Sequence, residues 1–268
     1  PLAQPHLLFC FSPTDPHHSS LPPAAARARE FLLAQASADY AVTAARFFKT
    51  GRGDYGEGDR FIGVRVPDVR KTARQFFRDL TPSEVLPLLA DPVHECRLLA
   101  LILWTQQFAR GDEACREEIV AHYLAHTDGI NNWDLVDLSA YEIVGNFLLS
   151  RDRSLLDRLA GSTSLWEQRI AIVSTWAFIR RGEFDDTLRL ADRLLTHPHD
   201  LIHKAVGWML REVGKRDKKR LESFLESRCR RMPRTMLRYA VERFSPDERA
   251  RYMRRDWAAF LPTRQLSQ

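Results

Sequence analysis

Hydrophobic residues recur at helical spacing along most of the chain. From residue 24 onward, apolar side chains fall three and four positions apart, which is the periodicity of an amphipathic helix. The pattern predicts a first helix pair at residues 24–37 and 39–49, and a third helix that begins at Pro67. It then predicts long apolar helices at residues 94–108, 133–149, 166–180, 201–213 and 233–244. Shorter amphipathic helices are predicted between them, at residues 112–126, 184–195 and 218–228.

The long helices begin at regular intervals, which predicts a repeat architecture. Their first residues are 39, 33, 35 and 32 positions apart, and helix pairs that recur every ~35–40 residues are typical of an α-solenoid. A globular helical bundle is the alternative, and periodicity alone does not exclude it. One strand-like stretch, residues 61–66, is too short and isolated to found a sheet. We therefore expect an all-α solenoid that forms a single domain over residues 24–268.

Residues 1–23 differ from the rest of the chain. They are rich in proline and histidine and have no periodicity, so we expect a flexible leader. The apolar stretch at residues 7–11 is short, lacks preceding basic residues and is followed by prolines, which makes it a poor secretory signal. No apolar run approaches the length that spans a bilayer.

The cysteines and histidines indicate a reduced, metal-free protein. None of the cysteines forms a Cys-x-x-Cys pair; they are Cys10, Cys96, Cys115 and Cys229. We therefore expect free thiols and a cytoplasmic protein. His199 and His203 stand four residues apart but lack the glutamate of a His-Glu-x-x-His motif, so no metal site is expected.

Charge is distributed unevenly along the chain. The net charge is only +5, but residues 201–268 contain 18 basic and 8 acidic side chains, whereas the first 200 residues carry an acidic excess. This asymmetry favours a polyanionic partner at the C-terminal part, with nucleic acid as the leading candidate. A solvated, arginine-rich helical surface is the alternative.

One predicted helix combines cations with an exposed aromatic. In residues 201–215, one face is apolar, and a second face holds Lys204, Trp208, Arg211 and Lys215 at positions i, i+4, i+7 and i+11. Cations placed for phosphates beside an aromatic that contacts a sugar or base explain this combination. Alternatively, Trp208 packs against a neighbouring helix and the cations are solvated.

Two further segments carry candidate chemistry. In the segment 132–137, Trp133 and Asp137 share a helix face. A carboxylate beside an aromatic wall suits the stabilisation of a cationic transition state. The alternatives are core packing for Trp133 and a structural salt bridge for Asp137. One repeat later, Arg169 lies near a helix N-terminus, where it meets a phosphate or pairs with Asp137 or Glu167.

The glycine-rich segment 51–59 suggests two other functions, and both are set aside. The tripeptide Arg52-Gly53-Asp54 spells an integrin-binding motif, which requires an extracellular setting. The segment also lacks the Gly-Lys-Ser/Thr sequence of a phosphate-binding P-loop.

Six blocks of the sequence, in order, resemble the AlkD-type alkylpurine DNA glycosylases. They are FFKTG at 47–51, YGEGD at 55–59, GVRVP at 63–67, NWDLVD at 132–137, WEQR at 166–169 and HKAVGWMLRE at 203–212. The resemblance covers roughly residues 24–260. It implies HEAT-like helical repeats whose basic concave surface holds duplex DNA, in a protein that we expect to be monomeric.

The resemblance also implies an activity and its residues. The activity is hydrolysis of the N-glycosidic bond of 3-methyladenine and 7-methylguanine in base excision repair, without a metal or organic cofactor and without flipping the base. Asp137 is then the catalytic carboxylate, Trp133 and Trp208 form an aromatic cleft, and Arg169 is an active-site arginine that engages the DNA backbone. Lys204, Arg211 and Lys215 are the expected DNA-binding cations. A non-catalytic HEAT-repeat protein that binds DNA structures is the alternative, and a protein–protein scaffold is the third possibility.

Overall fold

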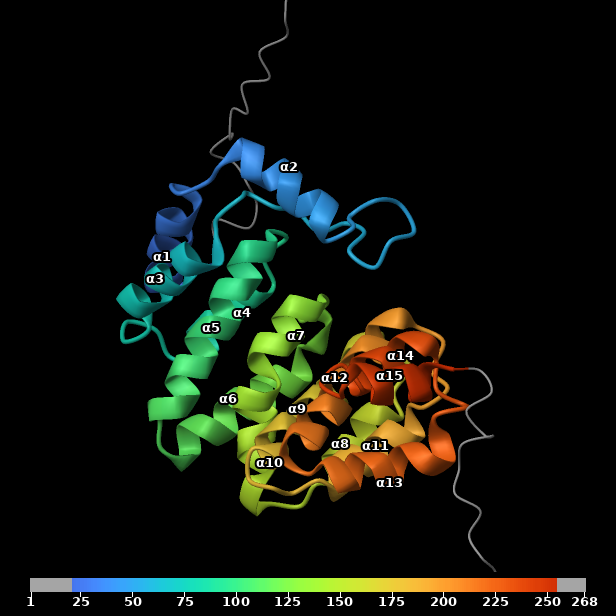
Figure 1. The fold of residues 1–268 in the computed structure, drawn as a ribbon. Coiled ribbons are helices and arrows are strands. Elements are labelled where there is room, and N and C mark those ends of the chain that lie inside the picture. The colour runs from blue at the N-terminus through green and yellow to red at the C-terminus, as the bar shows by residue number, and fades with distance from the viewer. Residues whose placement is uncertain (1–20, 255–268) are drawn as a thin grey trace, which may run out of the picture.

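The computed structural model describes residues 21–254, which form two rows of helices along a curved array (Figure 1). The inner row comprises α3 (Val66–Phe76), α5 (His94–Arg110), α7 (Trp133–Ser139), α9 (Leu165–Ser174), α12 (Asp200–Arg216) and α14 (Arg234–Ala240). The outer row comprises α1 (Pro23–Leu33), α4 (Leu86–Leu89), α6 (Glu113–Ala125), α8 (Ser154–Ala160), α11 (Asp185–Arg193), α13 (Lys218–Arg228) and α15 (Pro246–Met253). This arrangement confirms the all-α solenoid expected from the periodicity.

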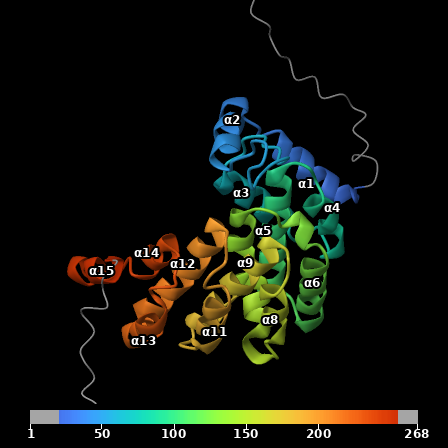
Figure 2. The same cartoon turned by 90° about the vertical axis from the view of Figure 1, so that its right-hand side faces the viewer.

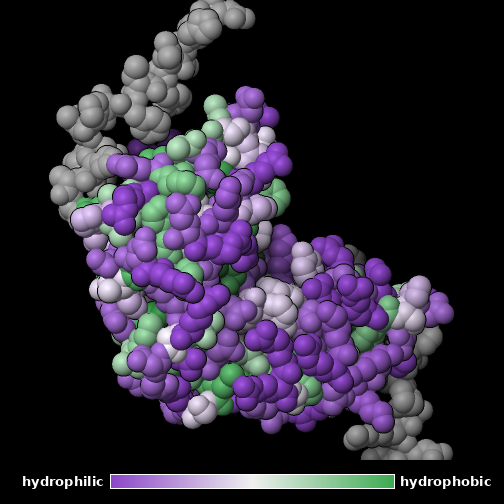
Figure 3. Space-filling model, turned by 90° about the vertical axis from the view of Figure 1, so that its left-hand side faces the viewer, coloured by the Kyte–Doolittle hydropathy of each residue, from purple (hydrophilic) through white to green (hydrophobic). Residues whose placement is uncertain are grey.

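The two rows bury a continuous apolar core between them. Within α5, every residue from His94 to Trp104 is buried, and the Trp104 indole donates a hydrogen bond to the carbonyl of Pro82. Figure 2 shows the helices of the first repeats and those of the last repeats at opposite ends of the array. One outer face, shown in Figure 3, is predominantly hydrophilic with smaller hydrophobic patches. The core thus runs along the array, as in other repeat proteins.

Two of the long predicted helices are interrupted. The segment predicted as 133–149 consists of α7, a π-helical turn (Tyr141–Gly145) and a 3₁₀ turn (Leu148–Ser150). Gly145 donates its backbone N–H to the carbonyl of Ala140, and a Cβ there would lie 2.3 Å from the carbonyl oxygen of Ser174. The wider turn therefore accompanies a close crossing between this segment and α9.

The segment predicted as 166–180 also divides, into α9 and α10 (Trp176–Ile179). The hydroxyl groups of Ser174 and Thr175 donate to the carbonyls of Ile170 and Ile172. Such side-chain bonds compete with the backbone ladder and bend helices.

Helix α2 (Ala38–Phe47) stands apart from the two rows at the N-terminal end of the array, and the loop after it extends toward the side on which α7 and α14 lie (Figure 1). Ala44 is its buried residue, so α2 contributes little to the core. The chain returns to the array at Gly63, which has a positive φ of 78°. A Cβ at Gly63 would lie 2.1 Å from the carbonyl oxygen of Ser37, so this close approach requires glycine.

The strand-like stretch 61–66 forms no sheet. Next to it, the described residues contain an isolated parallel bridge between Arg60 and Val93. The backbone N–H groups of residues 62–64 instead donate to the buried carboxylate of Glu95. The Glu95 carboxylate thus accepts hydrogen bonds from backbone N–H groups that would bond to a neighbouring strand in a sheet.

Most of the predicted leader lies outside the described residues, and α1 begins at Pro23. Between residues 21 and 254, no helix has the length and apolar character needed to cross a membrane.

Candidate functional site

A cavity of about 740 Å³ opens on the inner face of the array. Its walls come from α2 and the loop after it, from α7, and from α9, α12 and α14. The lining residues are Phe47, Lys49, Gly53, Asp54, Tyr55, Trp133, Asp137, Arg169, His199, Asp200, Leu201, Lys204, Trp208, Arg211 and Tyr239. The cavity thus brings together six of the seven site residues predicted from the sequence, and Lys215 is the exception.

Asp137 and Arg169 form a two-point ion pair at the cavity. Arg169 Nε donates to Asp137 Oδ1 at 2.9 Å, and Nη2 donates to Oδ2 at 2.8 Å. The Asp137 side chain is 20% exposed and that of Arg169 is 5% exposed, so the carboxylate is the more accessible partner. Burial raises the pKa of Asp137, and the guanidinium opposes this rise by favouring the ionised form. Of the alternatives open for Arg169, the structure shows the pair with Asp137.

The same guanidinium also donates through Nη1 to the backbone carbonyl of Leu201 at the start of α12. Three of the five N–H groups of Arg169 are therefore engaged within the protein. Glu167, the other acid considered as its partner, instead accepts a hydrogen bond from the Thr127 hydroxyl. Arg169 is thus placed to hold Asp137 between α7, α9 and α12.

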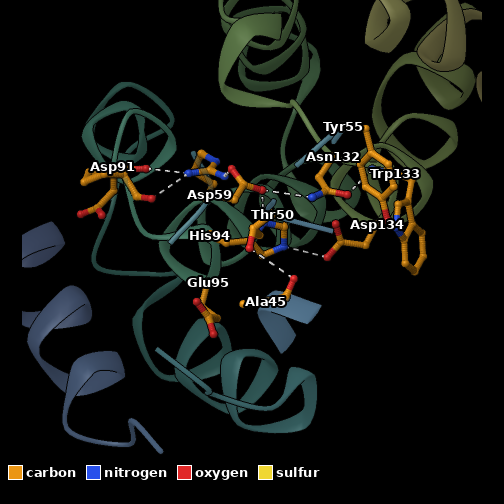
Figure 4. Close-up of polar contacts among 12 residues, drawn as sticks. Ala45, Thr50, Tyr55, Asp59, Asp91, His94, Glu95, Asn132, Trp133 and Asp134 are labelled. Atoms are coloured by element: carbon orange, nitrogen blue, oxygen red, sulfur yellow. Dashed lines mark hydrogen bonds and ion pairs between the residues drawn. The ribbon is translucent and has the colours of Figure 1, made fainter. Parts of the chain in front are cut away.

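Trp133 is the first residue of α7 and is partly buried. Asn132 caps the helix by accepting the Trp133 backbone N–H at 2.8 Å. The indole stacks on Phe48, with ring centroids 5.4 Å apart, and its Nε1 donates to the Tyr55 hydroxyl at 3.2 Å (Figure 4). Trp133 also makes an edge contact with Phe47 and lines the cavity.

Trp208 lies on α12 and lines the same cavity. Its ring centroid is 5.4 Å from that of Trp176 on α10, so Trp208 packs against a neighbouring helix as well as facing the open space. Trp208 therefore packs against a neighbouring helix, as one interpretation of the sequence expected, and its contact with a sugar or base stays a prediction.

The predicted cations of α12 all have acidic partners. Lys204 Nζ lies 2.7 Å from Asp200, Arg211 pairs with Glu242, and Lys215 lies 3.0 Å from Glu212. The lining contains four basic side chains and three carboxylates. The cavity is therefore mixed in charge and only slightly basic, in contrast to the strong positive excess of the C-terminal sequence.

Several lining residues were not identified from the sequence. The glycine-rich loop was set aside as a phosphate loop, yet Asp54 and Tyr55 line the cavity, and so does the 64% exposed Phe47. His199 also lines the cavity, where its ring accepts the backbone N–H of Leu201 at the start of α12. The resemblance at residues 47–51 and 55–59 was the signal that pointed to this part of the chain.

The described residues contain no cluster of His, Cys, Asp and Glu side chains arranged to hold a metal ion.

Comparisons with known proteins agree with this architecture. One solved structure, described as a predicted DNA alkylation repair enzyme from Enterococcus faecalis, superposes with a TM-score of 0.64 at 17% identity. The alignment covers 79% of this chain and 98% of that one, and at this identity it shows the shared fold alone. No curated protein matches the chain. The family model described as DNA alkylation repair enzyme matches residues 28–244, and the protein therefore belongs to the DNA alkylation repair enzyme family.

Proposed function

We propose that this protein is a DNA glycosylase that hydrolyses the N-glycosidic bond of cationic alkylated purines, such as 3-methyladenine and 7-methylguanine, in duplex DNA. The observation that carries the proposal is the Asp137 carboxylate, held at two points by Arg169 in a cavity that Trp133 and Trp208 also line. Family membership supports the role in alkylation repair.

The chemistry requires little more than this arrangement. Alkylation at N3 or N7 leaves the purine cationic, so the base is already a good leaving group and needs no strong general acid. As the bond breaks, positive charge develops on the deoxyribose. A fixed carboxylate stabilises this charge, because its electrostatic effect is large in a partly buried site. Asp137 has further lone pairs beyond those that Arg169 occupies, and they are available to orient the attacking water.

Two aromatic rings complete the proposed site. The indole face carries negative charge density that favours a cationic sugar or base. Trp133 is fixed from behind by Phe48 and at its edge by Tyr55, so it is preorganised for this contact. The cavity is partly open to solvent, and we propose that the lesion stays in the helical stack during excision.

Lys204 and Arg211 are the proposed contacts to DNA phosphates from the cavity. Each has a carboxylate partner that a phosphate would have to replace, so their contribution depends on exchange of ion pairs. Lys215 does not line the cavity, and we propose that it makes a weaker contact with a DNA phosphate at the edge of the cavity. The main proposed role of Arg169 is to hold Asp137. Its remaining N–H groups are proposed to contact the DNA backbone.

The test is incubation of the protein with methylated duplex DNA, followed by chromatography of the released bases. The wild-type protein should release 3-methyladenine or 7-methylguanine. Asp137→Asn should lower the single-turnover rate by roughly 10²–10³-fold while barely changing DNA affinity, because the charge matters most in the transition state. Binding to methylated duplex without release of a base would instead support the non-catalytic DNA-binding alternative. An Asp137→Asn variant with the wild-type rate would refute the role given to this carboxylate.

A further inference from the structure

A buried ionic network lies directly behind Trp133 (Figure 4). The ring of His94, at the start of α5, lies between two carboxylates: Nδ1 is 3.2 Å from Asp59 and Nε2 is 2.9 Å from Asp134. Asp59 also accepts from Arg97 at 2.6 Å and from the Asn132 side-chain amide at 3.0 Å. The network therefore joins the loop after α2, the N-terminus of α5 and the N-terminus of α7.

Both neighbours of Trp133 in the sequence belong to this network. Asn132 is held by Asp59 and caps α7, and Asp134 is held by His94. Asp59 also ends the loop that carries Tyr55, whose hydroxyl accepts the indole N–H of Trp133. The backbone of Trp133 is thus fixed on both sides, and its ring edge is fixed by the same loop.

The imidazole also supports the Trp133 ring through an aromatic stack. His94 stacks on Phe61 with ring centroids 4.5 Å apart, and Phe61 stacks on Phe48 at 5.0 Å. Phe48 in turn stacks on Trp133. Burial lowers the pKa of His94, but hydrogen bonds to Asp134 and Asp59 raise it, to a net value of about 9. A protonated ring is the form that both carboxylates and an aromatic face favour.

Stability alone is a weak explanation for such a network. The His94 and Asp59 side chains are 2% and 4% exposed, and buried ion pairs seldom stabilise a fold more than well-packed apolar residues do. What buried ion pairs add is precise orientation, because each hydrogen bond holds its two groups in one geometry. Active sites need this precision, since misplacement by about 1 Å costs on the order of 10²-fold in rate.

We infer that His94, Asp59 and Asp134 are positioning residues, which set Trp133 and the loop after α2 against Asp137; this inference rests on the proposed glycosylase function. The network contacts no cavity space itself and acts through Trp133 and Tyr55. It is therefore expected to govern the rate of excision rather than the affinity for duplex DNA.

The chain offers a matched control on its outer side. Arg153 also lies between two carboxylates, at 2.7 Å from Asp186 and 2.6 Å from Glu183. The Asp186 side chain is 19% exposed and that of Asp134 is 16% exposed, but Asp186 does not line the cavity. Asp134→Asn and Asp186→Asn therefore remove the same charge from two ion-paired side chains of similar exposure, one beside Trp133 and one remote from it.

The experiment combines kinetics with fluorine NMR of protein labelled with 5-fluorotryptophan, in which Trp133→Phe identifies the Trp133 line. Asp134→Asn should shift or broaden this line and lower single-turnover excision about tenfold or more, with duplex Kd within about twofold. Asp186→Asn should leave both the line and the rate unchanged. An unchanged Trp133 line and an unchanged rate per folded molecule in Asp134→Asn would overturn the inference, whatever the change in melting temperature.

A second variant covers the case in which Asp134→Asn does not fold. Asn132→Ser keeps a helix-capping side chain but removes the amide that donates to Asp59, and it should move the Trp133 line in the same way. If it does not, the inference is refuted. Should the wild-type protein release no base, the proposed function fails, and the position of the Trp133 line still decides whether the network orients this ring.

Discussion

Raising the pH should destabilise the folded protein through His94. Its ring faces the Asp59 and Asp134 carboxylates, and the Arg97 guanidinium lies on the other side of Asp59. The pKa of His94 is about 9 in the folded protein, against an ordinary value of 6.5. The folded state therefore holds this proton more tightly than the unfolded chain does, and protonation stabilises the fold.

The size of the effect follows from the two pKa values. At about 1.4 kcal/mol for each tenfold change in proton affinity, the difference corresponds to roughly 3 kcal/mol. This stabilisation is fully present below pH 6.5, declines as the pH rises, and is lost once the pH passes about 9. For a protein of this size, it amounts to roughly 6–12 °C in melting temperature.

Urea denaturation at several pH values between 6 and 10 measures this loss. The comparison is between the wild-type protein and His94→Gln, which has no titrating group at this position. Since the other titrating groups are common to both proteins, the difference between their curves isolates the imidazole. Asp134→Asn removes one of the two carboxylates and should move the loss of stability to lower pH.

Parallel curves for the wild-type protein and His94→Gln over this range would refute the reasoning, because the folded protein would then hold the His94 proton no more tightly than the unfolded chain does. A loss in the wild-type protein that is complete by about pH 7 would likewise mean that the two carboxylates raise the pKa of His94 only slightly.

Three other predictions concern the cavity and the fold. Lys204→Ala and Arg211→Ala should weaken binding to damaged and undamaged duplexes alike, each reducing the slope of log K against log salt by about 0.9, and Lys215→Ala should have the smallest effect. Trp208→Ala should slow excision of charged lesions more than neutral ones, by about 0.5–2 kcal/mol in activation free energy, which single-turnover rates on paired substrates would measure. Gly63→Ala should lower stability by about 1–3 kcal/mol in thermal melts, because its φ is positive and its Cβ would collide with backbone.

The solenoid was predictable because each of its helices follows from the spacing of apolar residues within a short segment. Apolar spacing fixes each helix, and the predicted helix at residues 218–228 coincides with α13. The division of the segment 133–149 was not predictable, because it accompanies the close approach of Gly145 to Ser174 in the next repeat. Apolar periodicity continues through a π-turn, so the local pattern carries no sign of it.

The sequence predicted those parts of the candidate site whose positions follow from a single helix. Trp133 and Asp137 share a helix face, and Trp208 follows from the pattern of its own helix. The wall formed by the loop after α2 was not predictable from local spacing. Its position involves contacts between residues far apart in the sequence, such as that between Asp59 and Asn132, which are 73 residues apart.

The spacing of ion pairs along the array explains why Asp137 meets Arg169. These residues are 32 positions apart, which is about one repeat, so they lie on neighbouring inner helices. Arg211 and Glu242 are 31 positions apart, and Arg153 and Asp186 are 33 apart. Joining adjacent repeats by ion pairs is thus a recurrent structural device in this chain.

What distinguishes the pair at the cavity is its environment. Exposed ion pairs between repeats, such as Arg220 with Asp185, contribute little because water and salt screen them, about 0–1 kcal/mol each. The Arg169 side chain is 5% exposed, so its attraction to Asp137 is screened far less, and the carboxylate is held in one orientation. A carboxylate fixed in this way presents its oxygens in one direction, toward the place where the proposed reaction would form a cationic sugar. Burial at the inner face therefore distinguishes this ion pair from the exposed pairs between repeats, and it is the property on which the proposed catalytic role of Asp137 depends.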